Sequence, residues 1–508
     1  MLLRAVSRSG TWKRSLSATA RVCTNRLIAH PQMQRLSLTR AYASAPQGSF
    51  LSAGQPIHET HSHQLRPGEI TPGISAQEYY ARRQLILDSI PDKSLVIIPG
   101  NDVQFATNSV FYEFRQDPNF FYLTGFLEPQ AALVLYRENE NNMESIFFVP
   151  GKDYQAELWD GTRSGPNGAI EMFNADRAYP FSEIYSQIEL LLKDAETIYM
   201  DTFPAKTSNR LPSFFKSHGQ NVVKNSLVEL FKKAGRKEYK SAVALVEKSR
   251  LVKSEAEIDN LRIAAELSSA AYNKAYATGF RTEGQLQAFL DYEFRMAGCE
   301  ESAYLPVVAG GAHALTIHYT RNDDLLHDGD MVLVDAGGRY GGYCADISRT
   351  WPVSGKFTEP QRDLYQACLN VNKECIKLCT ASSGLSLHDI HSHSESVMLT
   401  ELKNCGFTGL TQRQLHVLYP HYIGHNLGID VHDITQPPRY AKLQPGQVIT
   451  IEPGVYVPEN SELFPKHFRG LGIRIEDDVV VGERDYEVIT ADTWKEIEDI
   501  ERAAEGRL

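Results

Sequence analysis

Two aspartates flank a glycine-rich turn in the segment MVLVDAGGRYGGYCADISRT, residues 331–350. A hairpin centred between Tyr340 and Gly341 would place Asp335 and Asp346 directly opposite each other on neighbouring strands. Side chains at such positions have Cβ atoms roughly 4.5–5.5 Å apart, and like charges there destabilise a sheet. Two divalent cations roughly 3.5–4 Å apart would turn this repulsion into binding energy. The segment therefore predicts one wall of a metal site.

Further groups that could bind a metal ion occur later in the chain. Glu452 lies between the apolar run VITI and a Pro-Gly break, where an isolated buried charge would be costly. In GIRIEDDVVV, the two-residue alternation of a strand places Arg474 and Glu476 on one face. The segment PHYIGHNLGIDVHD adds three imidazoles, those of His421, His425 and His432. Four carboxylates with one imidazole form a hard, oxygen-rich donor set that favours Mn²⁺, and Co²⁺, Fe²⁺ or Zn²⁺ could substitute.

The elements that must position these groups are predicted by helix caps and strand patterns after residue 250. Three helix starts are indicated by Ser or Thr followed three residues later by Glu or Gln, at Ser254 and Glu257, Thr282 and Gln285, and Thr358 and Gln361. Strands are expected in MVLVDAG, YCADISRTWPV, QVITIEPGVYV and GIRIEDDVVVG. Helices followed by hairpins that carry acids predict an α+β catalytic domain rather than a doubly wound sheet.

The preceding part of the chain has a different pattern. Residues 77–240 mix short apolar runs, such as LVIIP and AALVLY, with helical segments such as FSEIYSQIELLLKD, which predicts an α/β domain. Residues 43–75 are polar and contain Gly and Pro, as in a linker or an arm. We therefore expect a linker over 43–75, an N-terminal domain over 76–245 and a catalytic domain over 246–508.

The first 42 residues are predicted to be a mitochondrial presequence. Residues 1–50 hold eight basic residues and no acid, and the first acidic residue is Glu59. This Arg- and Ser-rich composition without a long apolar core is typical of presequences, and a basic tail that binds an acidic partner is the alternative. The whole chain has a formal charge of −11, so the remainder carries about −19, which argues against nucleic-acid binding. No stretch reaches the roughly 18 apolar residues that a membrane span needs.

The series DAG…D, GHNLG, EPG and RIED resembles the metallopeptidases of the pita-bread fold, which include methionine aminopeptidases, prolidases and aminopeptidase P. The resemblance implies that two divalent metal ions, with Mn²⁺ expected, are held by Asp335, Asp346, His425, Glu452 and Glu476. Methionine aminopeptidases lack a preceding domain and are a poor match. The expected fold is therefore an α+β pita-bread catalytic domain preceded by a smaller, creatinase-like α/β domain, as in the aminopeptidase P group.

The same resemblance assigns roles to residues around the metal site. His318, in the motif IHYT, and His432 are expected to donate hydrogen bonds to the developing oxyanion and the scissile bond. Glu452 is expected to move a proton to the leaving nitrogen. His421 flanks the ligand His425 as in aminopeptidase P and is assigned to the catalytic residues.

Substrate contacts are expected from three further residues. Arg474 shares a strand face with Glu476, so it either orients that ligand from outside or serves as a charge partner without catalytic weight. Tyr456 is assigned to the substrate site. Trp159, in ELWDGTRSG, either reaches the active site of a neighbouring subunit or is an ordinary core aromatic.

The expected activity is the removal of one residue from the N termini of peptides or proteins, because Asp346 and an adjacent metal would hold the substrate α-amino group. The segment LTRAYASA resembles presequences cut first two residues beyond Arg40 and then after Tyr42, a second cut that mitochondrial members of the aminopeptidase P group perform. We therefore expect a hydrolase that trims a bulky residue (Tyr, Phe or Leu) from imported proteins in the mitochondrial matrix or at the matrix face of the inner membrane. A second location stays open.

Two alternatives remain, together with an expectation about assembly. A plain Xaa-Pro aminopeptidase or prolidase would act on proline-containing peptides. A non-catalytic pita-bread module would serve as a chaperone, but such relatives have lost ligands, whereas this chain retains all five. The resemblance also implies a homo-oligomer, either a dimer or a tetramer.

Overall fold

The computed structural model describes residues 52–201, 237–435 and 437–506. The presequence expected over 1–42 and the first part of the arm expected over 43–75 lie outside these described residues. Within the remainder of that arm, β1 (Glu69–Thr71) pairs with β2 (Ile74–Ser75) in a short antiparallel hairpin.

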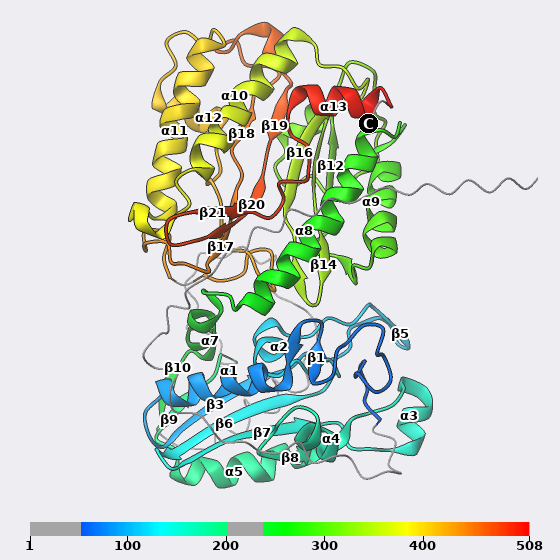
Figure 1. Ribbon diagram of the computed structural model, residues 1–508, viewed down its shortest axis with the longest axis vertical. Helices are drawn as coiled ribbons and strands as arrows, with labels where there is room; N and C mark the ends of the chain where they lie inside the picture. The colour runs from blue at the N-terminus through cyan, green and yellow to red at the C-terminus, as the bar shows by residue number, and fades with distance from the viewer. Residues whose placement is uncertain (1–51, 202–236, 436, 507–508) are drawn as a thin grey trace, which may run out of the picture. The chain divides into compact units, whose positions relative to one another are not determined.

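A six-stranded sheet forms the framework of the N-terminal half (Figure 1). Its strands lie in the order β10 (Glu238–Lys240), β9 (Thr197–Tyr199), β3 (Ser94–Pro99), β6 (Ala132–Asn139), β7 (Asn142–Val149) and β8 (Arg177–Pro180). Side chains of β3 alternate between the two faces: Leu95 and Ile97 belong to the cluster with α5 (Ile184–Asp194), whereas Val96 and Ile98 belong to the cluster with α1 (Ala76–Ser89). Helices thus cover both faces of the sheet, which confirms the predicted α/β domain.

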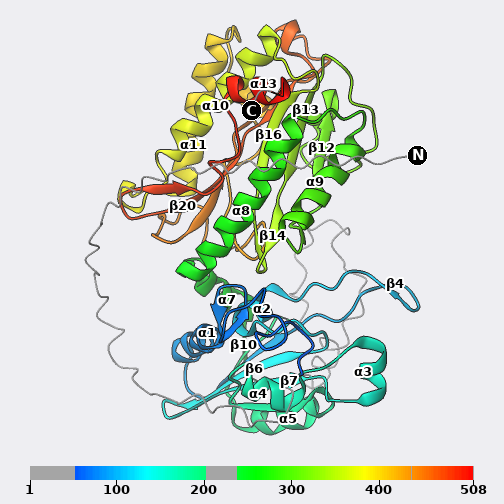
Figure 2. The same ribbon diagram turned by 45° about the vertical axis from the view of Figure 1, so that its right-hand side comes forward.

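The N-terminal half also contains shorter elements outside this sheet. They are α2 (Pro118–Thr124), α3 (Tyr154–Asp160), α4 (Gly165–Glu171) and the hairpin of β4 (Phe105–Thr107) and β5 (Val110–Phe111). Figure 2 shows the β4 hairpin extending away from the sheet, and its large apolar side chains are exposed.

The C-terminal half contains two helix pairs, each followed by a three-stranded antiparallel sheet. The first pair, α8 (Glu255–Tyr276) and α9 (Glu283–Ala297), precedes the sheet of β12 (Val307–Gly310), β13 (Met331–Ala336) and β16 (Ile347–Pro352). The second pair, α10 (Glu359–Ile376) and α11 (Leu387–Asn404), precedes the sheet of β17 (Val448–Ile451), β20 (Asp477–Val481) and β21 (Tyr486–Val488). Figures 1 and 2 show α8 running beside the first sheet. The predicted α+β domain, with helices before acid-bearing strands, is confirmed.

Short ladders and helices complete this half. They are β11 (Glu301–Ser302), β14 (Gly338–Tyr340), β15 (Tyr343–Cys344), β18 (Gly454–Tyr456), β19 (Gly472–Arg474), α12 (Gln412–Leu418) and α13 (Ile497–Ala504).

The helices start where the caps predicted. α8 begins after a capping box formed by Ser254 and Glu257, and α10 has a box of the same kind. At α9 the Thr282 hydroxyl caps the helix, but the side chain of Gln285 accepts a hydrogen bond from the amide of Arg281 instead of completing the box.

The predicted turn of the Asp335 hairpin is misplaced by one residue, which displaces the strand pairing by two residues. Gly341 and Gly342 have φ angles of 58° and 85°, so the two-residue turn is centred between them and not one position earlier. As a result Asp335 lies opposite Ser348. Asp346 lies two residues before Ser348, so it is a diagonal neighbour of Asp335 on the same face rather than its direct partner.

Helix α7 (Ala242–Arg250) contributes to the junction between the two halves. The Tyr122 hydroxyl of α2 donates to the carbonyl of Ser249 over 2.8 Å, and the Arg250 guanidinium donates to the Asn119 side chain over 2.8 Å. The domain boundary predicted at 245/246 falls inside this helix and stays a prediction.

Candidate metal centre

Three of the five expected metal ligands lie in breaks between strand segments. Asp346 falls between β15 and β16, Glu452 between β17 and β18, and Glu476 between β19 and β20. Their backbone amides donate to groups in other segments of the chain. The amide of Asp346 donates to Asp478 Oδ2 (3.0 Å), that of Glu452 to Ile423 O (2.7 Å) and that of Glu476 to Ser348 O (3.0 Å). These bonds join the two sheets and the segment before His425 at the site where the ligands meet.

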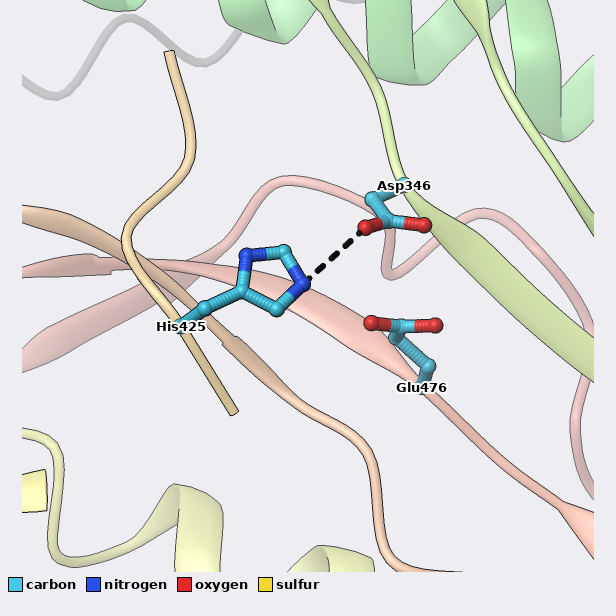
Figure 3. Close-up of side chains that lie close together, drawn as sticks. All are labelled: Asp346, His425 and Glu476. Carbon is cyan, nitrogen blue, oxygen red and sulfur yellow. Dashed lines mark ion pairs between the residues drawn. The ribbon is translucent and has the colours of Figure 1, made fainter. Parts of the chain in front are cut away.

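The structure brings most of the expected ligand set together. Asp346, His425 and Glu476 each offer one ligand atom within 4.8 Å of the other two, and their side chains face one another in Figure 3. The Asp346 Oδ2 to His425 Nε2 distance is 3.3 Å, and Glu452 Oε1 lies 3.7 Å from the same nitrogen. Asp335 is linked to Asp346 by a residue that the sequence did not single out.

That residue is Tyr304, whose hydroxyl lies 2.6 Å from Asp335 Oδ1 and 2.6 Å from Asp346 Oδ1. One hydroxyl proton cannot satisfy both carboxylates at once. Burial raises the pKa of Asp335, the charge of Asp346 raises it further, and Arg474 opposes both effects. The repulsion inferred from the sequence therefore exists, although the two aspartates are diagonal neighbours.

The electrostatics of the side chains favour a bound cation. Burial raises the pKa of Glu476 well above its usual range, and neighbouring carboxylates add to the shift. Burial also raises the pKa of Glu452 to about 7, against the opposing charges of His425 and Arg474. Burial would lower the pKa of His425, but its hydrogen bond to Asp346 and the charge of Glu452 raise it to about 9. A buried donor set with this surplus of carboxylate fits hard divalent cations.

Arg474 connects two of the expected ligands, Asp335 and Glu476, through hydrogen bonds. Its guanidinium donates to Asp335 Oδ2 (2.7 Å), to Ser348 Oγ (2.9 Å) and to the Tyr456 hydroxyl (2.8 Å). Ser348 in turn donates to Glu476 Oε2 over 2.6 Å. Arg474 thus contacts one expected ligand directly and another through a hydroxyl, an arrangement that orients both.

His421 is held on both ring nitrogens. Its Nε2 lies 2.9 Å from the Tyr456 hydroxyl, and its Nδ1 lies 2.9 Å from the carbonyl of Tyr422. Because the Tyr456 oxygen accepts from Arg474, its proton is available for Nε2, which leaves the imidazole proton on Nδ1. Burial, followed by the charge of Arg474, lowers the pKa of His421 to about 3, so the ring is neutral. Tyr456 is buried and supports this arrangement from outside the cleft.

A cleft of about 940 Å³ opens onto the cluster, and His318 and His432 line it. The His432 ring lies 4.4 Å from the His425 ring at an interplanar angle of 74°. Apolar lining includes Leu305 and Ile317. The cleft residues include all five expected metal ligands, His421 and Arg474.

Trp159 lies outside this cleft. It is 85% exposed on α3, beside Tyr154 and Leu158, which are 84% and 72% exposed. An ordinary core aromatic is therefore excluded. A contact with a neighbouring subunit stays a prediction.

Carboxylates and one imidazole that converge from two sheets of a pita-bread domain define a metallopeptidase. The chain belongs to metallopeptidase family M24, whose model matches residues 259–483, and the model of the aminopeptidase P N-terminal domain matches residues 79–199. The protein is a metallo-aminopeptidase of that family.

Relatives that resemble most of the chain include the following three. Intermediate cleaving peptidase 55 of Saccharomyces cerevisiae is 47% identical over 468 residues, which cover 90% of each chain. Xaa-Pro aminopeptidase 3 of Homo sapiens is 39% identical and covers 88% of this chain and 90% of its own. The mitochondrial Intermediate cleaving peptidase 55 of Arabidopsis thaliana is 38% identical and covers 88% of this chain and 87% of its own.

Solved structures agree with this family assignment. Crystalline Icp55 from S. cerevisiae, without its N-terminal 58 residues, matches with a TM-score of 0.78 and 45% identity, over 87% of this chain and all of its own. Zinc-substituted aminopeptidase P of Escherichia coli in complex with product matches with a TM-score of 0.77 and 32% identity, over 86% of this chain and 99% of its own.

Proposed function

We propose that this metallo-aminopeptidase removes a single bulky N-terminal residue, such as Tyr, Phe or Leu, from proteins imported into mitochondria after their presequences have been cleaved. The observation that carries the proposal is that all five expected ligands line one cleft in a chain 47% identical to a peptidase named for cleaving intermediates. The peptide N terminus is the substrate group that such a site must recognise.

Two divalent ions, which we propose to be Mn²⁺, would be held by Asp335, Asp346, His425, Glu452 and Glu476. Bound there, they would activate a water molecule and polarise the scissile carbonyl.

The side chains around the metal centre have separate tasks in this proposal. Asp346 would hold the free α-amino group of the substrate, which limits cleavage to the first peptide bond. His318 and His432 project into the cleft and would donate hydrogen bonds to the carbonyl oxygen as negative charge develops on it. Glu452, whose oxygens lie 3.7 Å from His425 and 3.9 Å from His421, would carry the proton to the leaving nitrogen.

His421 and Arg474 are better assigned to orientation than to proton transfer or substrate contact. Both nitrogens of His421 are engaged by protein groups. Arg474 is 2% exposed and donates to three partners in the cluster. Tyr456 joins the two. We assign these three side chains the task of holding the ligands and Glu452 in place.

We further propose a mitochondrial location and a homo-oligomeric assembly. The basic, acid-free residues 1–50 and a relative named as mitochondrial support the location. Among the described helices, none combines the length and apolar character that crossing a bilayer requires. Exposure of Trp159 beside Tyr154 supports a role for α3 at a subunit contact, with Trp159 reaching a neighbour's cleft.

An Xaa-Pro aminopeptidase or prolidase activity is the second candidate, and the 39% identity to Xaa-Pro aminopeptidase 3 favours the former. Kinetics with Mn²⁺ on Tyr-Ala-Ser and Tyr-Pro-Ala peptides would separate the two specificities. A non-catalytic chaperone role conflicts with retention of the five ligands. Full peptidase activity in Asp346→Ala would overturn the assignment of catalysis to this set of ligands.

Mass spectrometry of mitochondrial N termini from a deletion strain tests the physiological role. Precursors should retain one bulky residue in the deletion strain and lose it when the gene is restored. If the same precursors begin at the fully trimmed residue without the gene, the proposal fails.

A further inference from the structure

A buried charge cluster lies directly behind His432, outside the cleft. The Asp433 carboxylate receives Arg250 on Oδ1 at 2.6 Å and Lys253 on Oδ2 at 3.0 Å. The side chains of Asp433 and Lys253 are each 1% exposed, and that of Arg250 is 4% exposed. Asp430, which is partly exposed, is a second anion 3.0 Å from Arg250. Asp433, Arg250 and Lys253 do not line the cleft, whereas Asp430 does, so the three buried charges lie behind the cleft wall rather than in it.

Asp433 also closes the segment that carries the two neighbouring imidazoles, residues 425–433, which we call the His432 loop. The amide of Asp433 donates to the carbonyl of Asn426 over 3.0 Å, which joins the ends of the loop. The carbonyl of Gly428 accepts from the amide of Cys344 over 2.9 Å, next to the strand break of Asp346. A Cβ at Gly428 would lie 2.7 Å from the Asp433 carboxylate, so the loop folds tightly around it.

The geometry distinguishes a positioning role from general stabilisation. Buried ion pairs contribute little net stability compared with apolar side chains of similar volume, so stability alone gives no reason for three buried charges. Their distinctive property is direction, because each carboxylate oxygen has its own cation. The imidazole of His432 is on the adjacent residue, and its ring contacts that of His425 at 4.4 Å. The two cations fix the Asp433 side chain, and a shift of the backbone at Asp433 after loss of either cation would displace the ring of the adjacent His432.

We propose that Asp433, clamped by Arg250 and Lys253, is a positioning residue that sets the His432 imidazole against His425 and the scissile bond. The inference rests on the role of His432 in the proposed function. Because Arg250 also bonds Asn119 of α2 over 2.8 Å, the clamp connects the N-terminal half of the protein to the geometry of the site.

A double-mutant cycle on the full-length, Mn²⁺-loaded enzyme tests this role. Asp433→Asn and His432→Ala should each lower kcat on a Tyr-Ala-Ser peptide by about 10²-fold, with KM changed only a few-fold. The double variant should lose no more than either single variant, because Asp433 acts through His432. Losses that multiply in the double variant would overturn the inference.

A milder variant covers the case in which Asp433→Asn does not fold. Lys253→Met leaves Arg250 to neutralise Asp433, and it should lower kcat roughly tenfold while the metal content is unchanged. The matched control is Lys248→Met on the exposed face of α7, which should behave as wild type. Equal kcat values for the two methionine variants would overturn the inference.

A crystal structure of Asp433→Asn, or of Lys253→Met, keeps this inference separate from the proposed function. The His432 and His425 rings should leave their 4.4 Å contact. Rings that stay in place would overturn the positioning role even if the enzyme is active. An inactive wild-type protein whose variant rings do move would instead refute the proposed function alone.

Discussion

The two histidines assigned to the substrate contacts are carried by segments that are anchored in different ways. The His432 loop is held by Asp433 between two buried cations. Residues 310–324, which we call the His318 segment, are held by Glu283 at the first turn of α9, whose side chain is fully buried. The Glu283 carboxylate accepts from Gly310 N (2.9 Å), His313 Nδ1 (2.9 Å), Tyr319 OH (2.8 Å) and Asp324 N (3.0 Å).

A buried carboxylate can therefore organise a loop with or without a matching cation. Glu283 is stabilised by several hydrogen-bond donors and by its place at the positive end of a helix. Asp433 depends on full charges, whose removal leaves other charges buried. We therefore expect the two anchors to differ in the size of the effect when each is neutralised.

Removal of the metal ions should give the largest effect and should separate the two segments. Each ion present at about a thousandfold its Kd contributes ~4 kcal/mol to the free energy of unfolding. The His432 loop begins at the expected ligand His425, whereas the His318 segment carries none. Hydrogen exchange after chelation should therefore speed up over 425–433 and change little over 310–324. Equal exchange in both segments would contradict the comparison.

The stability of the metal-free protein should also fall as pH rises from about 4.5 to 9. Burial raises the folded-state pKa of Glu452 from 4.5 to about 7. Despite burial, the hydrogen bond to Asp346 raises the pKa of His425 from 6.5 to about 9. Both groups bind protons more tightly in the folded state, so the stability they contribute at low pH is lost as each folded-state pKa is passed. Thermal melts across this range, with and without Mn²⁺, measure the effect.

Asp433→Asn should have the next largest effect. It leaves Lys253 buried without a counter-charge and Arg250 with the partly exposed Asp430 alone, which should lower the free energy of unfolding by about 3–5 kcal/mol. Denaturant titration measures the loss. Asp430→Asn serves as the control, because its partly exposed side chain should contribute less than about 1 kcal/mol.

Glu283→Gln should lower the free energy of unfolding by less, about 1–3 kcal/mol. It leaves buried hydrogen-bond donors without an acceptor, but it leaves no buried cation without a counter-charge. The same titration compares it directly with Asp433→Asn. Asp323→Asn, on the exposed part of the His318 segment, is the matched control and should be close to neutral. A loss as large as that of Asp433→Asn would erase the distinction between the anchors.

His313→Phe should have the smallest effect. It keeps the ring that stacks on Tyr319 at 4.4 Å but removes the hydrogen bond to Glu283. A loss of about 1 kcal/mol is expected. A loss similar to that of Glu283→Gln would mean that the anchor depends on this one imidazole.

Local rules predicted much of the fold and part of the site. The caps at Ser254 and Thr358 mark helix starts because they depend on residues three positions apart. Strand alternation placed Arg474 in the cluster with Glu476 and directed Ile473 and Ile475 to the core. The set of five ligands came from a family resemblance.

The features that the sequence did not reveal depend on distant partners or on a choice between similar residues. Asp433 meets its cations across about 180 positions, and Tyr304 meets Asp346 across 42, so no local pattern indicates either contact. The register error has another cause. Several glycines near the turn could adopt a positive φ, and only the structure shows that Gly341 and Gly342 do.

That pair of glycines acts as a spacer of fixed length. The β13 and β16 strands are connected through β14, a two-residue turn and β15, so the length of that turn decides which residues of β13 and β16 share a face. Deleting one glycine would shift the pairing by one position and turn Asp346 away from Asp335 without changing either strand. The dimensions of the metal site are thus set partly by a residue count at a point that touches no ligand.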